Sequence, residues 1–207
     1  MKKFSIILAG LMISCSLQAA NTESNTETGV ESEQVQIKKS SKKVIKKSIE
    51  REGDGTLVTE YDQQGNIIKI TEQYCSDCPA VEFTLKNGKI VSAKGGNKWY
   101  CEASVNKQKN TATYCLDGSE TEVEFNEFGY KKAVSVGEDG KCTDTYEYNK
   151  DGLLVKGVRI SVDSFDGTSY KETITYTYDV MSQDWTKRTA TFKDGNKYVT
   201  TRTVEYW

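Results

Sequence analysis

The chain has 207 residues, a formal net charge of −2, 36% hydrophobic residues and no histidine. The weak negative charge gives no case for binding nucleic acid. The absence of histidine excludes Ser-His and Cys-His nucleophile pairs as well as His-ligated metal sites, and with them much of nucleophilic and metal catalysis. The low hydrophobic content predicts a thin core, of a size that suits a single domain.

The N-terminus has the pattern of an export signal. Lys2 and Lys3 precede an apolar run over Phe4–Cys15, which suits a signal peptide and is too short to cross a bilayer. Cleavage after Ala19 predicts a signal peptide over residues 1–19 and a product free in the periplasm or outside the cell. The alternative is a lipobox ending at Cys15, whose lipidation would hold the protein at the outer-membrane surface.

Residues 20–43 are rich in Asn, Ser, Thr, Glu and Lys. Such a stretch buries too little to offset its ordering entropy, and we predict a disordered polar tether. Lysine pairs recur every four residues, at 38/39, 42/43 and 46/47. On a helix they would form a basic stripe that binds phosphates or an acidic partner. We prefer a solvated linker that leads into a first strand at Val44–Arg51. No later stretch approaches the roughly 20 apolar residues of a transmembrane segment.

Pairs of a short polar residue followed by glycine recur through the rest of the chain. Such pairs adopt positive φ readily and close hairpins. Between the pairs the residues alternate, as in Glu172–Asp179, where one face is aromatic and aliphatic and the other is threonine. We therefore predict a single all-β domain over residues 44–207, an antiparallel meander of about ten strands that forms an open barrel, a sandwich or a curved single sheet. The pairs are Asp54-Gly55, Asn87-Gly88, Asp117-Gly118, Asp139-Gly140, Asp151-Gly152, Asp166-Gly167 and Asp194-Gly195.

One hairpin unit recurs along the domain. In Tyr61–Ile68, Phe125–Tyr130 and Tyr148–Leu154 an aromatic residue ends a strand, a polar residue opens the turn and glycine follows four residues after the aromatic. The unit resembles the tyrosine-aspartate repeat of the Rhs and YD-repeat proteins, in which many copies wind into a shell. Only the first copy has Tyr, Asp and Gly at all three positions, and there are too few copies here for a shell. The whole plan also resembles that of small exported proteins of gut anaerobes.

The cysteines predict disulfides, because exported thiols pair by default. In the hairpin around residues 106–110, Cys101 faces Cys115, which makes this pair the first predicted bridge. Cys75 and Cys78 have three interpretations. The first, which we prefer, is a structural bridge, either between the two or from one of them to Cys142; the others are a redox motif and half of a four-thiolate zinc site. Cys142 is then the odd thiol. No metal site and no cofactor is predicted.

The rings suggest a function without catalysis. Our leading hypothesis is an exported binding or structural module, with Trp99, Tyr100 and Trp185 as candidates for stacking on a protein or glycan ligand of the cell envelope. For each ring, core filling is the simpler interpretation.

Two other classes of function stay open. Glu120, Glu122 and Glu124 share one strand face, so a carboxylate-dependent hydrolase acting on glycans is one alternative, although such a pattern is usually a solvated face. The other is an inhibitor of an exported enzyme, which would present the Cys75–Ala80 segment as a rigid loop.

Overall fold

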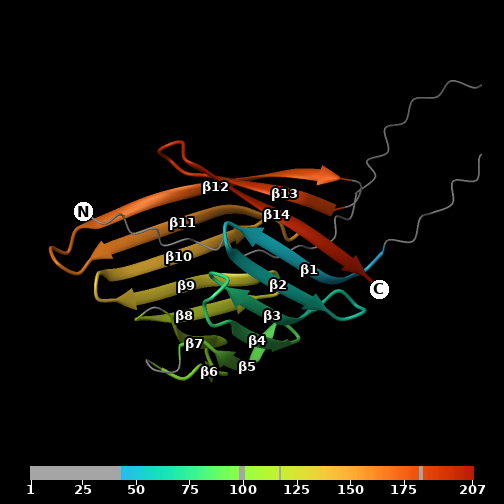
Figure 1. Cartoon of the computed structure of the whole chain (residues 1–207), viewed down its shortest axis with the longest axis horizontal. Helices are drawn as coiled ribbons and strands as arrows, with labels where there is room; N and C mark the ends of the chain where they lie inside the picture. Colours follow the sequence, from blue (N-terminus) through green and yellow to red (C-terminus); the bar gives the residue numbers. More distant parts are fainter. Residues whose placement is uncertain (1–42, 98–100, 117, 182–183) are drawn as a thin grey trace, which may run out of the picture.

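The computed structural model describes residues 43–97, 101–116, 118–181 and 184–207, and within them all regular structure is β (Figure 1). Fourteen antiparallel strands form one sheet. The predictions for residues 1–19 and for nearly all of 20–43 lie outside the described residues. The strands are β1 (Ile45–Glu52), β2 (Gly55–Tyr61), β3 (Ile67–Gln73), β4 (Val81–Lys86), β5 (Lys89–Gly95), β6 (Ser104–Asn106), β7 (Thr111–Leu116), β8 (Ser119–Asn126), β9 (Gly129–Gly137), β10 (Gly140–Tyr148), β11 (Leu154–Asp163), β12 (Ser169–Met181), β13 (Asp184–Thr191) and β14 (Lys197–Tyr206).

The sheet is a meander that curls into a nearly closed barrel. Its order is β5-β4-β3-β2-β1-β14-β13-β12-β11-β10-β9-β8-β7-β6. Every pairing joins strands that are consecutive in sequence, except the pairing of β1 with β14, and the consecutive strands β5 and β6 do not pair. The predicted all-β antiparallel meander is confirmed. The strand count exceeds the predicted ten or so, because short strands such as β6 are too brief to show an alternating pattern of their own.

A seam remains between β5 and β6, the two edges of the sheet. Asn110 bridges one part of it: its Oδ1 accepts from Ile90 N at 2.8 Å, and its Nδ2 donates to Gly88 O at 3.3 Å and to Phe125 O at 3.1 Å. At another point Asn97 N donates to Cys115 O at 2.7 Å. These bonds cover part of the edge that an open sheet would expose.

The predicted turns lie between consecutive strands. Asn87 and Gly88 have φ of 53° and 69°, two left-handed residues in succession, as a type I′ turn requires. In the YD-like turn after β2, Asp62 Oδ1 accepts from Gln64 N and Asn66 N, both at 2.9 Å. Asn149 Oδ1 accepts from Asp151 N and Leu153 N in the same way after β10. The shared requirement is a side-chain oxygen at this position, and the family resemblance itself stays a prediction.

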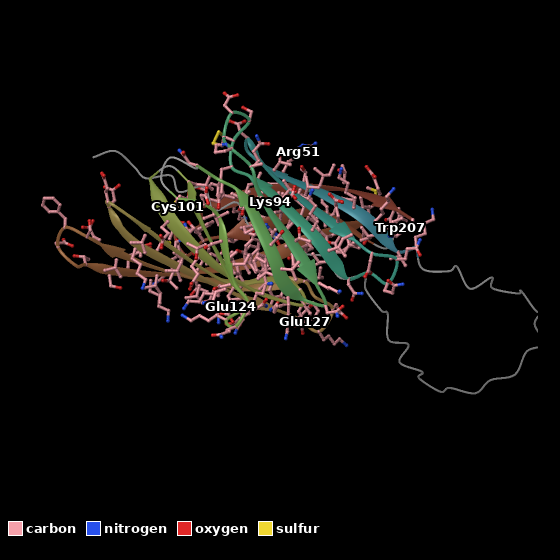
Figure 2. All side chains as sticks on the ribbon, turned by 90° about the horizontal axis from the view of Figure 1, so that it is seen from below. Arg51, Lys94, Cys101, Glu124, Glu127 and Trp207 are labelled. Carbon is pink, nitrogen blue, oxygen red and sulfur yellow. A yellow bond between two sulfur atoms is a disulfide. The ribbon has the colours of Figure 1, made fainter. Side chains whose placement is uncertain are left out.

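Core side chains fill the interior of the barrel, and its opposite walls lie close together. Phe83 of β4 is fully buried, and its ring centroid lies 5.6 Å from that of Tyr114, 5.3 Å from Phe125 and 6.1 Å from Tyr130, on β7, β8 and β9. Rings from opposite walls are therefore in contact, and side chains occupy the space between the walls (Figure 2). On the outer face, charged pairs such as Lys69–Glu82, at 2.7 Å, meet the solvent.

Candidate functional site

The structure contains both predicted disulfides. Cys75 is joined to Cys78 and Cys101 to Cys115, with Cα–Cα distances of 5.0 Å and 5.5 Å. Cys101 precedes the short strand β6, so its bridge ties the segment before β6 to β7. Because all four sulfurs are in disulfides, neither a zinc site nor a dithiol can use them in this state.

The Cys75–Cys78 disulfide closes a tight loop between β3 and β4. Within the loop, Cys78 N donates to Cys75 O at 3.1 Å. The Gln73 side-chain amide donates to Ser76 O at 3.1 Å and to Cys78 O at 3.0 Å. Ser76 and Asp77 are exposed at its tip. The disulfide and the Gln73 side chain therefore hold the loop in one conformation, with polar atoms exposed to the solvent.

Among the described cysteines Cys142 is the free thiol, and it is buried. Its Sγ donates to Asp144 Oδ2 at 3.9 Å and accepts from Ser161 Oγ at 3.8 Å. Arg159 holds Asp144 through Nε–Oδ1 and Nη2–Oδ2 contacts of 2.9 Å and 3.3 Å. Burial, with the Asp144 charge beside it, raises the pKa of Cys142. A buried thiol with a raised pKa is a poor nucleophile, so Cys142 acts as a packing residue.

An arginine cluster lies inside the barrel, formed by Glu50, Asp184, Trp185, Arg188 and Arg202. Arg188 and Arg202 are 1% and 4% exposed, and Glu50 is 2% exposed. Arg202 lies between two carboxylates, with Nε 3.9 Å from Glu50 Oε1 and Nη1 3.8 Å from Asp184 Oδ1. Burial raises the pKa of Glu50 to about 7, although the charges of both arginines lower it. The cluster is thus a buried group of charges of both signs.

Trp185 belongs to this cluster. It is 3% exposed, and the guanidinium of Arg202 lies 4.8 Å from its ring centroid. The ring of Tyr178 meets it edge-on at 5.4 Å. Trp185 therefore fills the interior, and the stacking platform predicted for it is not available at the surface of this structure. Trp99 and Tyr100 lie outside the described residues.

A second buried carboxyl, Glu72, is surrounded by tyrosines. Glu72 is 1% exposed, and Tyr130 donates its hydroxyl to Glu72 Oε2 at 3.0 Å. The hydroxyls of Tyr74 and Tyr114 are 3.1 Å apart beside it. Burial raises the pKa of Glu72 to about 7, against the lowering effect of the Tyr130 and Tyr74 hydroxyls.

A rim at one end of the barrel consists of Met181, Asp184, Tyr206 and Trp207. Met181 and the two rings lie at the surface, above the buried Asp184. Met181, Tyr206 and Trp207 are 71%, 36% and 55% exposed. The Tyr206 hydroxyl donates to Asp184 Oδ2 at 2.5 Å. Trp207 donates through Nε1 to Asp62 O at 3.3 Å and through its backbone N to Val44 O at 3.0 Å. Figure 2 shows Trp207 at one end and Cys101 toward the other.

The rim is connected to the interior through Asp184. One carboxylate oxygen of Asp184 accepts from Tyr206, and the other lies 3.8 Å from Arg202. The rings are also near cations, since Lys46 Nζ lies 5.2 Å from the Trp207 ring centroid. The sequence does not single out Trp207, because no local pattern shows that its ring lies beside β1.

The acids proposed for hydrolysis lie on the outer face of β8. Glu120 and Glu122 are exposed, and Glu124 Oε1 is 2.6 Å from Lys131 Nζ. This is the arrangement of a solvated strand face. Among the described residues, no group of three or more His, Cys, Asp or Glu side chains could hold a metal ion.

Comparisons with known proteins give little further information. No family model matches the chain, and no curated protein does. Among solved structures, a porin-like protein from Bacteroides uniformis matches with 10% identity over 78% of this chain and 98% of that one, at a TM-score of 0.29. A porin-like protein from Bacteroides vulgatus matches with 10% identity over 80% and 99%, at a TM-score of 0.32. Likenesses this weak support no argument about this chain. Within the described ranges, no helix is long and apolar enough to cross a membrane.

Proposed function

We propose that the protein is an exported, non-catalytic module of the cell envelope that binds a glycan at the rim. The observation that carries this proposal is the fixed position of two exposed rings, Tyr206 and Trp207, at one end of the barrel. Hydrogen bonds hold Tyr206 on Asp184 and Trp207 on Asp62, so little side-chain entropy remains to be lost on binding.

The chemistry of the rim suits a polyhydroxylated ligand. An aromatic ring offers an apolar face to the C–H groups of a sugar, and its polar edge accepts or donates a hydrogen bond. Asp184 is only 9% exposed, and it holds the Tyr206 hydroxyl. The oxygen of that hydroxyl can still accept a hydrogen bond from a ligand, and a few such polar groups set ligand orientation. Export, the other part of the proposal, is supported by the predicted signal peptide.

A glycan array, followed by calorimetric titration of the best ligand, tests this function. Replacing Trp207 by Ala should weaken binding at least tenfold, since ring–ligand contacts are among the largest single contributions to binding. Phe165→Ala is the matched control: Phe165 is fully exposed at 100%, in the β11–β12 turn at the end opposite the C-terminus (Figure 1). An array without signal, or equal loss in both variants, would reject the proposal.

The loop closed by Cys75 and Cys78 favours a second candidate, an inhibitor of an exported enzyme. The disulfide and the two Gln73 bonds hold the loop in one conformation, and preorganisation of this kind raises affinity. The test is inhibition of a panel of secreted proteases and glycosidases, comparing the wild type with Asp77→Ala. Inhibition that this change abolishes would support the second candidate.

The hydrolase alternative gains no such support. Inside the barrel, Glu50 and Asp184 both approach Arg202. Glu50 is only 2% exposed, so a glycan cannot reach it in this structure. A catalytic pair must flank the bond that it cleaves.

A further inference from the structure

Three turns are in contact at one end of the barrel, beside the seam: the β4–β5, β6–β7 and β8–β9 turns. Asn110 of the β6–β7 turn donates through Nδ2 to Gly88 O in the β4–β5 turn at 3.3 Å and to Phe125 O of β8 at 3.1 Å. A Cβ at Gly88 would lie 3.7 Å from Glu127 Cα in the β8–β9 turn. Figure 2 shows Glu127 at the edge of the molecule opposite Arg51. We call the continuous surface of these turns the turn cluster; it consists of residues 86–89, 107–110 and 127–128.

Four exposed lysines lie in the turn cluster. Lys86 and Lys89 are a directly opposed pair across the β4–β5 hairpin, and Lys107 and Lys109 are in the β6–β7 turn. Like charges directly opposite each other destabilise a strand pair, and the two lysines of the neighbouring turn add to this repulsion. An anion that contacts all four ammonium groups would remove the repulsion.

The backbone that carries these lysines is held in one conformation. Asn106 Oδ1 accepts from two backbone N–H groups of the β6–β7 turn, at 3.1 Å and 3.2 Å. Ile90 N donates to Asn110 Oδ1 at 2.8 Å. Since Lys89 precedes Ile90 and Lys109 precedes Asn110, this bond keeps the two lysines close together. An anionic ligand therefore meets positive groups on a backbone that needs no further ordering, which lowers the entropic cost of binding.

Few acids offset the positive charge of the turn cluster. Among the described residues, none of its four lysines forms an ion pair. Glu127 is the one carboxylate of the turn cluster, all of whose residues the structure describes. The next acid along β8, Glu124, is already bound by Lys131 at 2.6 Å and is paired with Lys132 of β9. Four lysines and one glutamate give the turn cluster a net charge of +3.

We propose that the turn cluster binds an acidic polysaccharide, whose carboxylate, phosphate or sulfate groups contact the four lysines. Lysine presents a compact charge on a flexible stem, which suits anionic groups that are spaced along a polymer chain. Release of the counterions of the polymer supplies a large part of the binding free energy for such contacts. The site is separate from the rim, which lies on β12, β13 and the end of β14, and it does not depend on the glycan proposed there.

A polysaccharide chain fits the turn cluster better than a membrane or a folded protein does. Binding of either of these broad surfaces combines charge with an apolar anchor. None of the described large hydrophobic side chains that are exposed belongs to the turn cluster. Its one aromatic residue, Phe128, is half-buried and packs on Tyr148, with 5.8 Å between the ring centroids. A polymer chain is narrow enough to contact the turn cluster alone, and its charges need no apolar contact.

Titration of the full mature chain with polygalacturonate and with dextran sulfate at about 50 mM salt tests the proposal. Binding should weaken as salt is added, with a log–log slope of about 3, because four lysine contacts contribute roughly 0.7 each. Lys89→Glu together with Lys109→Glu should raise the dissociation constant about tenfold or more, since it replaces attraction by repulsion. Lys193→Glu with Lys197→Glu is the matched control. It changes the net charge equally, at two exposed lysines of the β13–β14 hairpin at the other end of the barrel, and should leave the dissociation constant within about twofold.

A milder variant separates a loss of binding from a loss of folding. Lys89→Gln with Lys109→Gln removes the two charges without adding acids, so it should weaken binding by less than the reversal does, with an unchanged or higher midpoint of thermal unfolding. Vesicles of phosphatidylglycerol are the comparison for a membrane and should bind more weakly than the polysaccharides. The proposal is overturned if neither polysaccharide binds, if both charge-reversal variants weaken binding equally, or if the vesicles bind more tightly than the polysaccharides.

Discussion

Two glutamates are buried in the same barrel, and their surroundings differ. Glu50 lies within the influence of two cations, Arg202 and Arg188, whereas Glu72 contacts tyrosine hydroxyls. Burial is the largest influence on both, and it raises the pKa of each from 4.5 to about 7. A similar pKa therefore arises in two ways: two cations offset a large desolvation at Glu50, and neutral donors are enough at Glu72.

This similarity has a consequence for stability. Because both folded pKa values lie above the 4.5 of an exposed glutamate, the folded chain binds more protons than the unfolded chain between about pH 4.5 and pH 7. The protonated forms of Glu50 and Glu72 therefore contribute to the free energy of unfolding. This contribution is complete below pH 4.5 and is lost as the pH rises through 7. The effect of a mutation on stability depends on the partners of each glutamate, which are arginines at Glu50 and tyrosines at Glu72.

Arg202→Met should have the largest effect. It removes the cation from between Glu50 and Asp184, and breaking a buried pair costs about 3–5 kcal/mol. The loss should be greatest at pH 8 and smaller at pH 5, where Glu50 is protonated. Urea unfolding at both pH values measures it. Lys187→Met, which removes an exposed pair with Asp179 at 3.6 Å, is the control and should cost at most about 1 kcal/mol. Equal losses of unfolding free energy in the two variants would contradict the idea that a buried ion pair matters more than an exposed one.

Glu72→Gln should stabilise the protein at pH 8 by about 3 kcal/mol, which corresponds to the shift in its pKa. The amide oxygen of glutamine can still accept from Tyr130, and no cation is left without its partner. At pH 4.5 the variant and the wild type should be nearly equal. The measurement is the free energy of unfolding across this range, with exposed Glu122→Gln as the control. A variant less stable than the wild type at pH 8 would show that Glu72 makes a stabilising charge interaction.

Tyr130→Phe should have the smallest effect of the three. It removes the hydroxyl that donates to Glu72 Oε2 at 3.0 Å, so the pKa of Glu72 should rise further and stability at pH 8 should fall by about 1–2 kcal/mol. Titration of the carboxyl by NMR follows the pKa. Tyr148→Phe removes a hydroxyl that donates to a backbone oxygen, Tyr130 O, at 2.9 Å, and should leave the pKa of Glu72 unchanged. If both variants shift it alike, the direct hydrogen bond is not the cause.

The turns and the disulfides could be predicted because their signals are local. An Asn-Gly pair needs no distant partner to adopt positive φ, and Cys101 and Cys115 flank a single short hairpin. The buried charges gave no such signal. In β1 the inward positions include Ser48 and Glu50, while Ile49 between them is less buried. A hydrophobic pattern therefore predicts the wrong face of this strand.

Barrel closure was also beyond prediction. The β1–β14 pairing joins residues about as far apart as the domain allows, as in the bond from Thr200 Oγ1 to Glu52 Oε2. Nothing in either strand marks the other as its partner. For the same reason the rim, which depends on the pairing of β14 with β1, could not be located in the sequence.

The β1–β14 pairing also determines the order in which the barrel can assemble. Every other pairing joins strands that follow one another along the chain, so two open meanders, β1–β5 and β6–β14, can form from hairpins by local steps. Their union must wait for β14, a strand of ten residues, and it is the slow, long-range step of folding. Until then Glu50 lacks Arg202 and remains in water. The buried charges therefore meet only when the circle of strands closes.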